Sequence, residues 1–140
     1  MYDIERLNKI IKDIEKYFSD LKEIGLTKDN LDDPKFFYSS SMVLFGILNR
    51  TIDLATEIIV KNEFGMPTSY EQYFELLSNE GIIGKPLSRE LRQLMRDRNI
   101  FAHEYYNLNK KQVLDISKRI HAVKDFLEKI KELVRKSKNV

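Results

Sequence analysis

The stretch RNIFAHEYY, residues 98–106, brings several chemically useful side chains together within nine residues. Arg98 carries a guanidinium that stays charged and can form paired hydrogen bonds with phosphate oxygens. His103 titrates near neutral pH and can therefore accept or donate a proton. Such groups suit RNA cleavage without a metal. A base takes the proton of the ribose 2′-OH, a cation stabilises the crowded phosphate, and an acid protonates the leaving 5′-oxygen.

The spacing of Arg98 and His103 is awkward for a single helix. Five residues correspond to about 140° around the axis and about 7.5 Å along it, so the two side chains would not share a face. Three arrangements are open: the helix ends or bends between them, Arg98 reaches across with its long side chain, or two subunits build the site jointly. Because an Arg and a His at this spacing often occur by chance, the polar end of a surface helix is the simpler interpretation.

Length and composition predict one ordinary domain without special chemistry. The chain has 140 residues, and Lys+Arg 24 nearly balance Asp+Glu 22, so the net charge of +2 neither indicates a nucleic-acid binder nor excludes a local basic patch. There is no cysteine, and the two histidines lie 18 residues apart, so we expect neither a metal nor a cofactor. The charged N-terminus and the lack of a long apolar run predict a cytoplasmic protein that does not enter a membrane.

The apolar periodicity predicts helices. A stripe with heptad spacing runs along the first segment, which we expect to end at Gly25: Ile4, Leu7, Ile11, Ile14, Phe18 and Leu21. A second helix is predicted from about Lys35 to Asn62. It is apolar on most sides, so it must be covered; companion helices could cover part of it and a second subunit the rest.

Further elements follow along the chain. Thr68 and Glu71 have capping-box spacing before a short helix, and another helix is predicted over residues 87–101. The last helix is expected to start near Asn109, with Gln112 at the third position, and to carry a second heptad stripe: Val113, Ile116, Ile120, Val123, Leu127, Ile130 and Val134. The predicted fold is an all-α, antiparallel bundle of four main helices plus a short one, homodimeric, with a frayed tail from about residue 135.

A polar line interrupts the apolar second helix. Asn49, Asp53 and Glu57 recur every four residues and so lie on one face, and Arg50 is placed to pair with Asp53. The line is either a solvated face with one ion pair or a strip beside a groove or subunit seam. In the second interpretation the carboxylates of Asp53 and Glu57 would orient an Arg or a His.

Other polar residues favour plain structural roles. We expect Arg96 to pair with Asp97 or Glu90 rather than to contact a phosphate. Tyr106 is interpreted as a core residue rather than as a second functional phenol beside Tyr105. His121 lies just off the apolar stripe of the last helix and is interpreted as a surface or boundary histidine.

The wider sequence resembles a known family. Arg98-x4-His103-x-Tyr105 resembles the R-x4-H-x-Y motif of the HEPN superfamily, specifically the HepT toxins. The segments YDIERLNKIIKDIEKYFSDL, FFYSSSMVLFGILNRTIDLATEII, GMPTSYEQYFELL and LRQLMRDRNIFAHEYYNLN look like the corresponding parts of that family. The resemblance covers about Tyr2 to Ile130 and implies one HepT-like domain over residues 1–140.

The resemblance implies a function. HepT-like proteins are helical homodimers, or higher oligomers built from dimers, whose Arg and His motifs line a shared cleft. Many are metal-independent ribonuclease toxins, neutralised by a minimal nucleotidyltransferase, MntA, that adds AMP to the motif tyrosine. Carried over, Arg98 and His103 would be catalytic, Asn99 supporting and Tyr105 the modified residue, whereas supporting roles for Asp53 and Glu57 rest on spacing alone.

Two other hypotheses compete with an RNA endonuclease. Some HEPN domains bind nucleotides or substrates for a partner nucleotidyltransferase without cleaving anything, and here Arg98 and His103 would only hold a phosphate. A plain dimeric helical adaptor would need neither group. The sequence names no RNA target.

Overall fold

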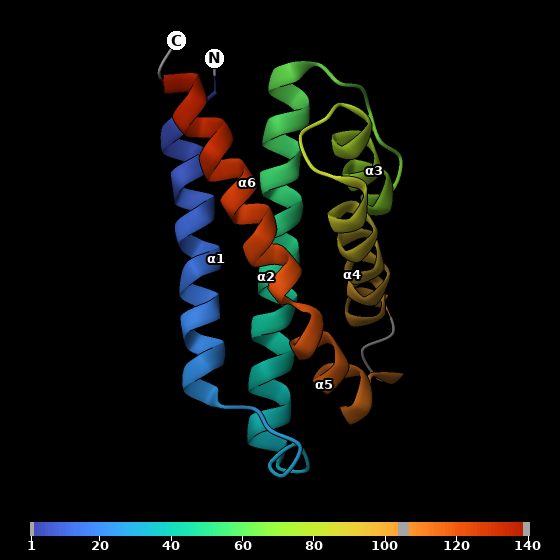
Figure 1. Cartoon of the computed structure of the whole chain (residues 1–140). Coiled ribbons are helices and arrows are strands. Elements are labelled where there is room, and N and C mark those ends of the chain that lie inside the picture. The colour runs from blue at the N-terminus through green and yellow to red at the C-terminus, as the bar shows by residue number, and fades with distance from the viewer. Residues whose placement is uncertain (1, 104–106, 139–140) are drawn as a thin grey trace.

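The computed structural model describes residues 2–103 and 107–138, and this part of the chain consists of helices joined by turns and loops. No strand occurs in these ranges, which confirms the predicted all-α class. The helices are α1 (Ile4–Ile24), α2 (Pro34–Asn62), α3 (Tyr70–Asn79), α4 (Lys85–His103), α5 (Lys110–Arg119) and α6 (His121–Lys138). Figure 1 shows α1 and α2 running antiparallel, with α6 crossing them obliquely toward the end where the chain begins.

The first helix begins and ends where its sequence predicts. The Asp3 side chain caps the N-terminus by accepting a hydrogen bond from the backbone of Arg6. Gly25 follows the last turn with φ 68°, a left-handed conformation in which a side chain would be strained. Leu7, Ile11 and Ile14 of the predicted stripe are buried. This apolar face packs α1 against α2.

The second helix is the centre of the bundle. It contacts α1, α3, α4, α5 and α6, so companion helices of the same chain cover most of its apolar surface. Asp33 caps it, and Pro34 occupies the first turn, where a missing N–H costs nothing. The cover is incomplete near this end, because the side chains of Tyr38 and Met42 are 69% and 77% exposed.

Capping boxes were predicted at the N-termini of α3 and α5, and the structure confirms one of them. The predicted box at Thr68 and Glu71 is wrong by one residue: Ser69 caps α3 and accepts from the backbone of Gln72, which has the same spacing from it. The Gln72 side chain accepts hydrogen bonds from Thr68 instead. At α5 the predicted box of Asn109 and Gln112 is confirmed.

The last helix is not continuous, which corrects the sequence prediction. α5 ends at Arg119, and α6 begins at His121 after a tightened turn in which the Val123 N–H donates to the Ile120 carbonyl. Just before the break, Ser117 Oγ donates to the Leu114 carbonyl and competes with the helical backbone. The apolar stripe continues across the break, since Ile116, Ile120 and Val123 are all buried. α6 extends to Lys138, beyond residue 135, where the sequence analysis placed the start of a frayed tail.

An ion-pair network joins α1 to α2. Arg50 donates to Asp13 on α1 at 2.6 Å and to Asp53 one turn away at 3.0 Å, so the predicted pairing with Asp53 is confirmed. Burial lowers the pKa of Arg50, but its hydrogen bonds to the two carboxylates outweigh this effect and raise it. Hydrogen bonds from Lys9 and Arg50 hold the pKa of Asp13 below its ordinary value of 3.8.

The lowered pKa of Asp13 predicts a pH-dependent contribution to stability. Its carboxylate stabilises the fold above the pKa of the unfolded chain, and this stabilisation is lost as the pH falls through the lower folded-state pKa. Asp13→Asn should therefore lower the free energy of unfolding by about 1 kcal/mol at pH 7 and by less at pH 3. Urea unfolding at both pH values measures the difference. The matched control is Asp20→Asn, in an exposed pair with Lys16, and an equal loss for Asp13→Asn at both pH values would contradict the prediction.

Candidate functional site

The helix α4 carries both motif residues without interruption. It extends to His103, so it does not end between Arg98 and His103, and at this spacing the two side chains leave it in different directions. Leu91, Leu94 and Phe101 on this helix are buried. Arg98 occupies the inward-facing position between them, because the spacings 91, 94, 98 and 101 follow one helix face. An arginine therefore stands where the helix would otherwise place an apolar residue.

Three residues from two other helices hold the Arg98 side chain. Its Nε donates to Asn49 Oδ1 on α2 at 2.9 Å. Its guanidinium carbon lies 4.8 Å from the ring centroid of Tyr70, the first residue of α3, and 5.3 Å from that of Phe45 on α2. Both rings are within the range of cation–π attraction. Phe45 also packs against Phe101, which fixes the ring from the other side. The guanidinium is thus positioned by α2, α3 and α4 together.

The partners of Arg98 are all neutral, unlike those of the arginines that form ion pairs between helices. Within residues 2–103 and 107–138, no carboxylate forms an ion pair with Arg98. Four other arginines are paired with carboxylates: Arg6 with Glu57, Arg50 with Asp13 and Asp53, Arg96 with Glu71, and Arg119 with Asp97 and Asp115. An amide and two rings fix the orientation of Arg98 without cancelling its charge. That charge can bind an anion such as a phosphate.

His103 is the last residue of α4, and its side chain is exposed. Asn99, predicted as a supporting residue, is also exposed on the same helix. The structure therefore brings Arg98 to a platform made by three helices, and it leaves His103 at the helix end, open to a substrate or to another subunit. Tyr105 and Tyr106, the predicted modification site and its neighbour, lie outside the described residues.

The three polar residues of the line on α2 have different partners. Asn49 holds Arg98, whereas Asp53 pairs with Arg50 and Glu57 pairs with Arg6. The two carboxylates orient arginines as their spacing suggested, but these arginines are not the motif arginine. Supporting roles for Asp53 and Glu57 in catalysis stay predictions. Sequence reasoning placed Asn49 in the line without assigning it a site role, and it did not identify Phe45 or Tyr70.

Arg96 pairs with a carboxylate as expected, although the partners predicted for it are wrong. Its guanidinium donates to Glu71 at 2.8 Å and to Gln93 one turn earlier, rather than to Asp97 or Glu90. Asp97 instead pairs with Arg119 of α5. The reason is direction: neighbouring residues on a helix point apart, so Arg96 reaches α3 while Asp97 faces α5.

An apolar hollow adjoins the Arg98 platform. Its volume is about 330 Å³, and its lining is mainly aromatic and aliphatic: Phe37, Tyr38, Ser41, Met42, Phe45, Phe101 and Leu108. Phe45 and Phe101 belong both to this hollow and to the packing around Arg98. The exposed apolar end of α2 is therefore continuous with the residues that hold the motif arginine.

No helix in the described ranges has the length and apolar character needed to cross a membrane.

Comparison with known proteins identifies relatives of the same architecture. A family model described as ribonuclease HepT-like matches residues 7–130. The mRNA nuclease HepT of Shewanella oneidensis is 35% identical over 83 residues, 59% of this chain. That alignment spans 58% of the relative, which is less than two thirds of its length.

Solved structures agree with the family match. A chain of the tri-AMPylated Shewanella oneidensis HEPN toxin in complex with MNT antitoxin superposes with a TM-score of 0.83 at 26% identity, covering 94% of this chain and 99% of that one. YutE of Bacillus subtilis, a cytosolic protein of unknown function, superposes with a TM-score of 0.84 at 16% identity, covering 98% and 95%. The likeness to YutE shows the fold alone.

The neutral support of Arg98 predicts the effect of a single charge. Asn49→Asp keeps the shape of the side chain but places a carboxylate against the guanidinium, which then no longer attracts an anion. Affinity for a single-stranded RNA oligonucleotide should fall roughly tenfold. The slope of log affinity against log salt concentration should become shallower by an amount that corresponds to about one phosphate contact. Fluorescence anisotropy over a salt series measures both quantities. Asn8→Asp on the exposed face of α1 makes the same charge change elsewhere, and an equal fall in that control would contradict the role of Asn49.

Proposed function

We propose that this chain, which belongs to the ribonuclease HepT-like family, cleaves RNA without a metal at a site built around Arg98 and His103. The observation that carries the proposal is the arginine held by neutral groups. Arg50 and Arg119, which join neighbouring helices, are each paired with carboxylates. Arg98 is instead fixed by Asn49, Phe45 and Tyr70 with its charge intact.

The proposed chemistry assigns one role to each group. The guanidinium of Arg98 binds the scissile phosphate and stabilises the negative charge that accumulates on its oxygens. The imidazole of His103 takes the proton from the ribose 2′-OH, so that the 2′-oxygen attacks phosphorus and the bond to the 5′-oxygen breaks. A second, protonated imidazole gives its proton to that leaving oxygen.

The proposal requires two copies of the chain in the active unit. One chain supplies one motif histidine, and its Arg98 and His103 leave α4 in different directions. A homodimer brings two motifs together, so that base and acid come from different subunits. The apolar hollow and the exposed Tyr38 and Met42 beside Phe45 provide a surface for this contact. Burial of such apolar surface is the main favourable term in association.

The biological role proposed is that of a toxin restrained by a partner. The relative with 35% identity is an mRNA nuclease, and the HEPN toxin with a similar structure is AMPylated and bound to MNT antitoxin. We infer a nucleotidyltransferase antitoxin for this chain and AMP addition at Tyr105. Each AMP would add a phosphodiester charge and bulk two residues from His103, which would repel RNA from the site.

Removing the imidazole tests the proposed cleavage. His103→Ala should lower the rate of RNA cleavage by about 10²- to 10⁴-fold, because a proton-transfer group is lost. The assay uses purified protein with a labelled RNA in excess EDTA. The chain has only two histidines, so His121→Ala is the matched control and should cleave like the wild type. Cleavage that survives His103→Ala would overturn the assignment.

The same assay distinguishes the second candidate function. A HEPN domain that only binds a nucleotide or RNA for its partner would show no cleavage in the wild type. It would still bind RNA, and Arg98→Ala would weaken that binding. Cleavage by the wild type that depends on both Arg98 and His103 would exclude this candidate.

Mass spectrometry tests the proposed modification. After co-expression with a cognate nucleotidyltransferase, the peptide that contains Tyr105 should gain the mass of one or more AMP groups. Tyr105→Phe should abolish this gain and keep the protein active in the presence of the partner. Tyr106→Phe is the neighbouring control and should be modified like the wild type. An unmodified peptide under neutralising conditions would contradict the inference.

A further inference from the structure

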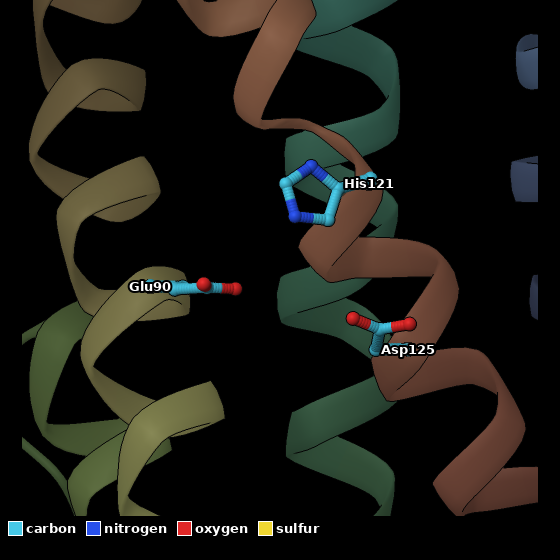
Figure 2. A group of neighbouring side chains, drawn as sticks. All are labelled: Glu90, His121 and Asp125. Atoms are coloured by element: carbon cyan, nitrogen blue, oxygen red, sulfur yellow. The ribbon is translucent and has the colours of Figure 1, made fainter.

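A second group of polar side chains converges away from the motif. Glu90 of α4 and His121 and Asp125 of α6 each offer one ligand atom, and these atoms lie within 4.8 Å of one another. Figure 2 shows the three side chains facing a common space between the two helices, with Glu90 on one side and His121 and Asp125 on the other. All three residues are exposed, so an ion can enter from solvent.

The surroundings of His121 favour the tautomer that can bind a metal. Its Nδ1 lies 3.1 Å from the backbone carbonyl of Lys118. A carbonyl only accepts, so this contact favours the neutral tautomer with the proton on Nδ1, which leaves the lone pair on Nε2. Figure 2 shows one ring nitrogen on the side of the carboxylates and the other pointing away from them. A backbone carbonyl on the second ring nitrogen is the usual arrangement of a metal-binding histidine.

The break in the last helix creates this arrangement. Because α5 ends at Arg119, His121 is the first residue of α6, and the carbonyl of Lys118 belongs to the preceding helix. Asp125 follows His121 by four residues and so lies on the same face of α6. Glu90 approaches from α4, and α4 and α6 are in contact. The three ligands thus come from two packed helices.

The two carboxylates have no other charged partner in the described part of the chain. Many acidic residues form ion pairs there, including Asp13, Asp53, Glu57, Glu71 and Asp97. Within residues 2–103 and 107–138, Glu90 and Asp125 form no ion pair, although both face the same space. Two like charges held close together repel each other, and a bound cation would remove that repulsion.

We propose that Glu90, His121 and Asp125 bind a Zn²⁺ ion. One imidazole and two carboxylates are ligands that zinc accepts, with a water at the fourth tetrahedral position. Mg²⁺ and Ca²⁺ prefer oxygen ligands alone and more of them. Tetrahedral zinc bonds of about 2.0–2.2 Å place neighbouring ligand atoms about 3.3–3.6 Å apart, so small rotations of the exposed side chains close the site.

The zinc site is separate from the proposed cleavage chemistry. Glu90 precedes Arg98 by eight residues on α4, about 12 Å along the helix axis. A metal here would join α4 to α6, and the ion pair between Asp97 of α4 and Arg119 of α5 joins α4 to the preceding helix. Its role is therefore structural: it would hold the motif helix against the last helix. Cleavage in EDTA and zinc binding are independent properties.

Zinc titration of the untagged, EDTA-treated and desalted protein tests the proposal. Isothermal titration calorimetry should show one Zn²⁺ per chain, and zinc should raise the melting temperature. His121→Ala and Asp125→Asn should each weaken binding at least tenfold and abolish the rise. Glu128→Gln, which removes an exposed carboxylate elsewhere on α6, should bind zinc like the wild type. These readouts need no RNA, so they remain informative if the protein does not cleave it.

Imidazole NMR locates the bound ion, because the chain has only two histidines. Zinc should shift the ring signals of His121, assigned by their absence in His121→Ala, and leave those of His103 in place. No binding, binding that His121→Ala leaves unchanged, or a shift confined to His103 would each overturn the proposal. Circular dichroism of every variant verifies that a variant that no longer binds zinc is still folded.

Discussion

The contact between Arg98 and its three neutral partners is the interaction on which the rest of the site depends. A charged guanidinium at an inward-facing helix position is costly unless its hydrogen bonds are satisfied. Asn49 accepts from it, while Tyr70 and Phe45 present their rings to its charge. A carboxylate would satisfy it better but would also neutralise it. The neutral partners therefore stabilise Arg98 less than a carboxylate would, but they leave its positive charge available to bind a phosphate.

This support exists because α2 lies at the centre of the bundle. Phe45 and Asn49 are four residues apart on α2, so one face of that helix delivers a ring and an amide together. Tyr70 lies beside Arg98 because α3, capped by Ser69, begins at this point. Phe101 of α4 packs against Phe45. The same aromatic residues line the hollow at the exposed end of α2. Support of the arginine and the surface proposed for dimerisation are consequently one continuous structure.

Local periodicity in the sequence was sufficient to predict the helices, but not their contacts. The stripe across α5 and α6 is buried as expected, whereas the stripe of α1 is buried at Leu7, Ile11 and Ile14 and only partly buried toward its two ends. Gly25 and Asn109 mark helix ends because their caps are local. The break at Ile120 could not be predicted in this way, because no Gly or Pro lies near it in the sequence. Asn49 and Arg98 are 49 residues apart, so only tertiary packing joins them. One signal was present in the sequence: Arg98 continues the apolar stripe of its own helix.

The chemistry of the RNA ends tests the central claim, cleavage through the ribose 2′-oxygen, most directly. In EDTA, the fragments should carry 2′,3′-cyclic phosphate and 5′-hydroxyl ends, because the 2′-oxygen displaces the 5′-oxygen. An oligonucleotide with 2′-deoxy sugars at the cleaved positions should stay intact. Fragments with 3′-hydroxyl and 5′-phosphate ends, or cleavage of the deoxy substrate, would contradict the mechanism assigned to Arg98 and His103.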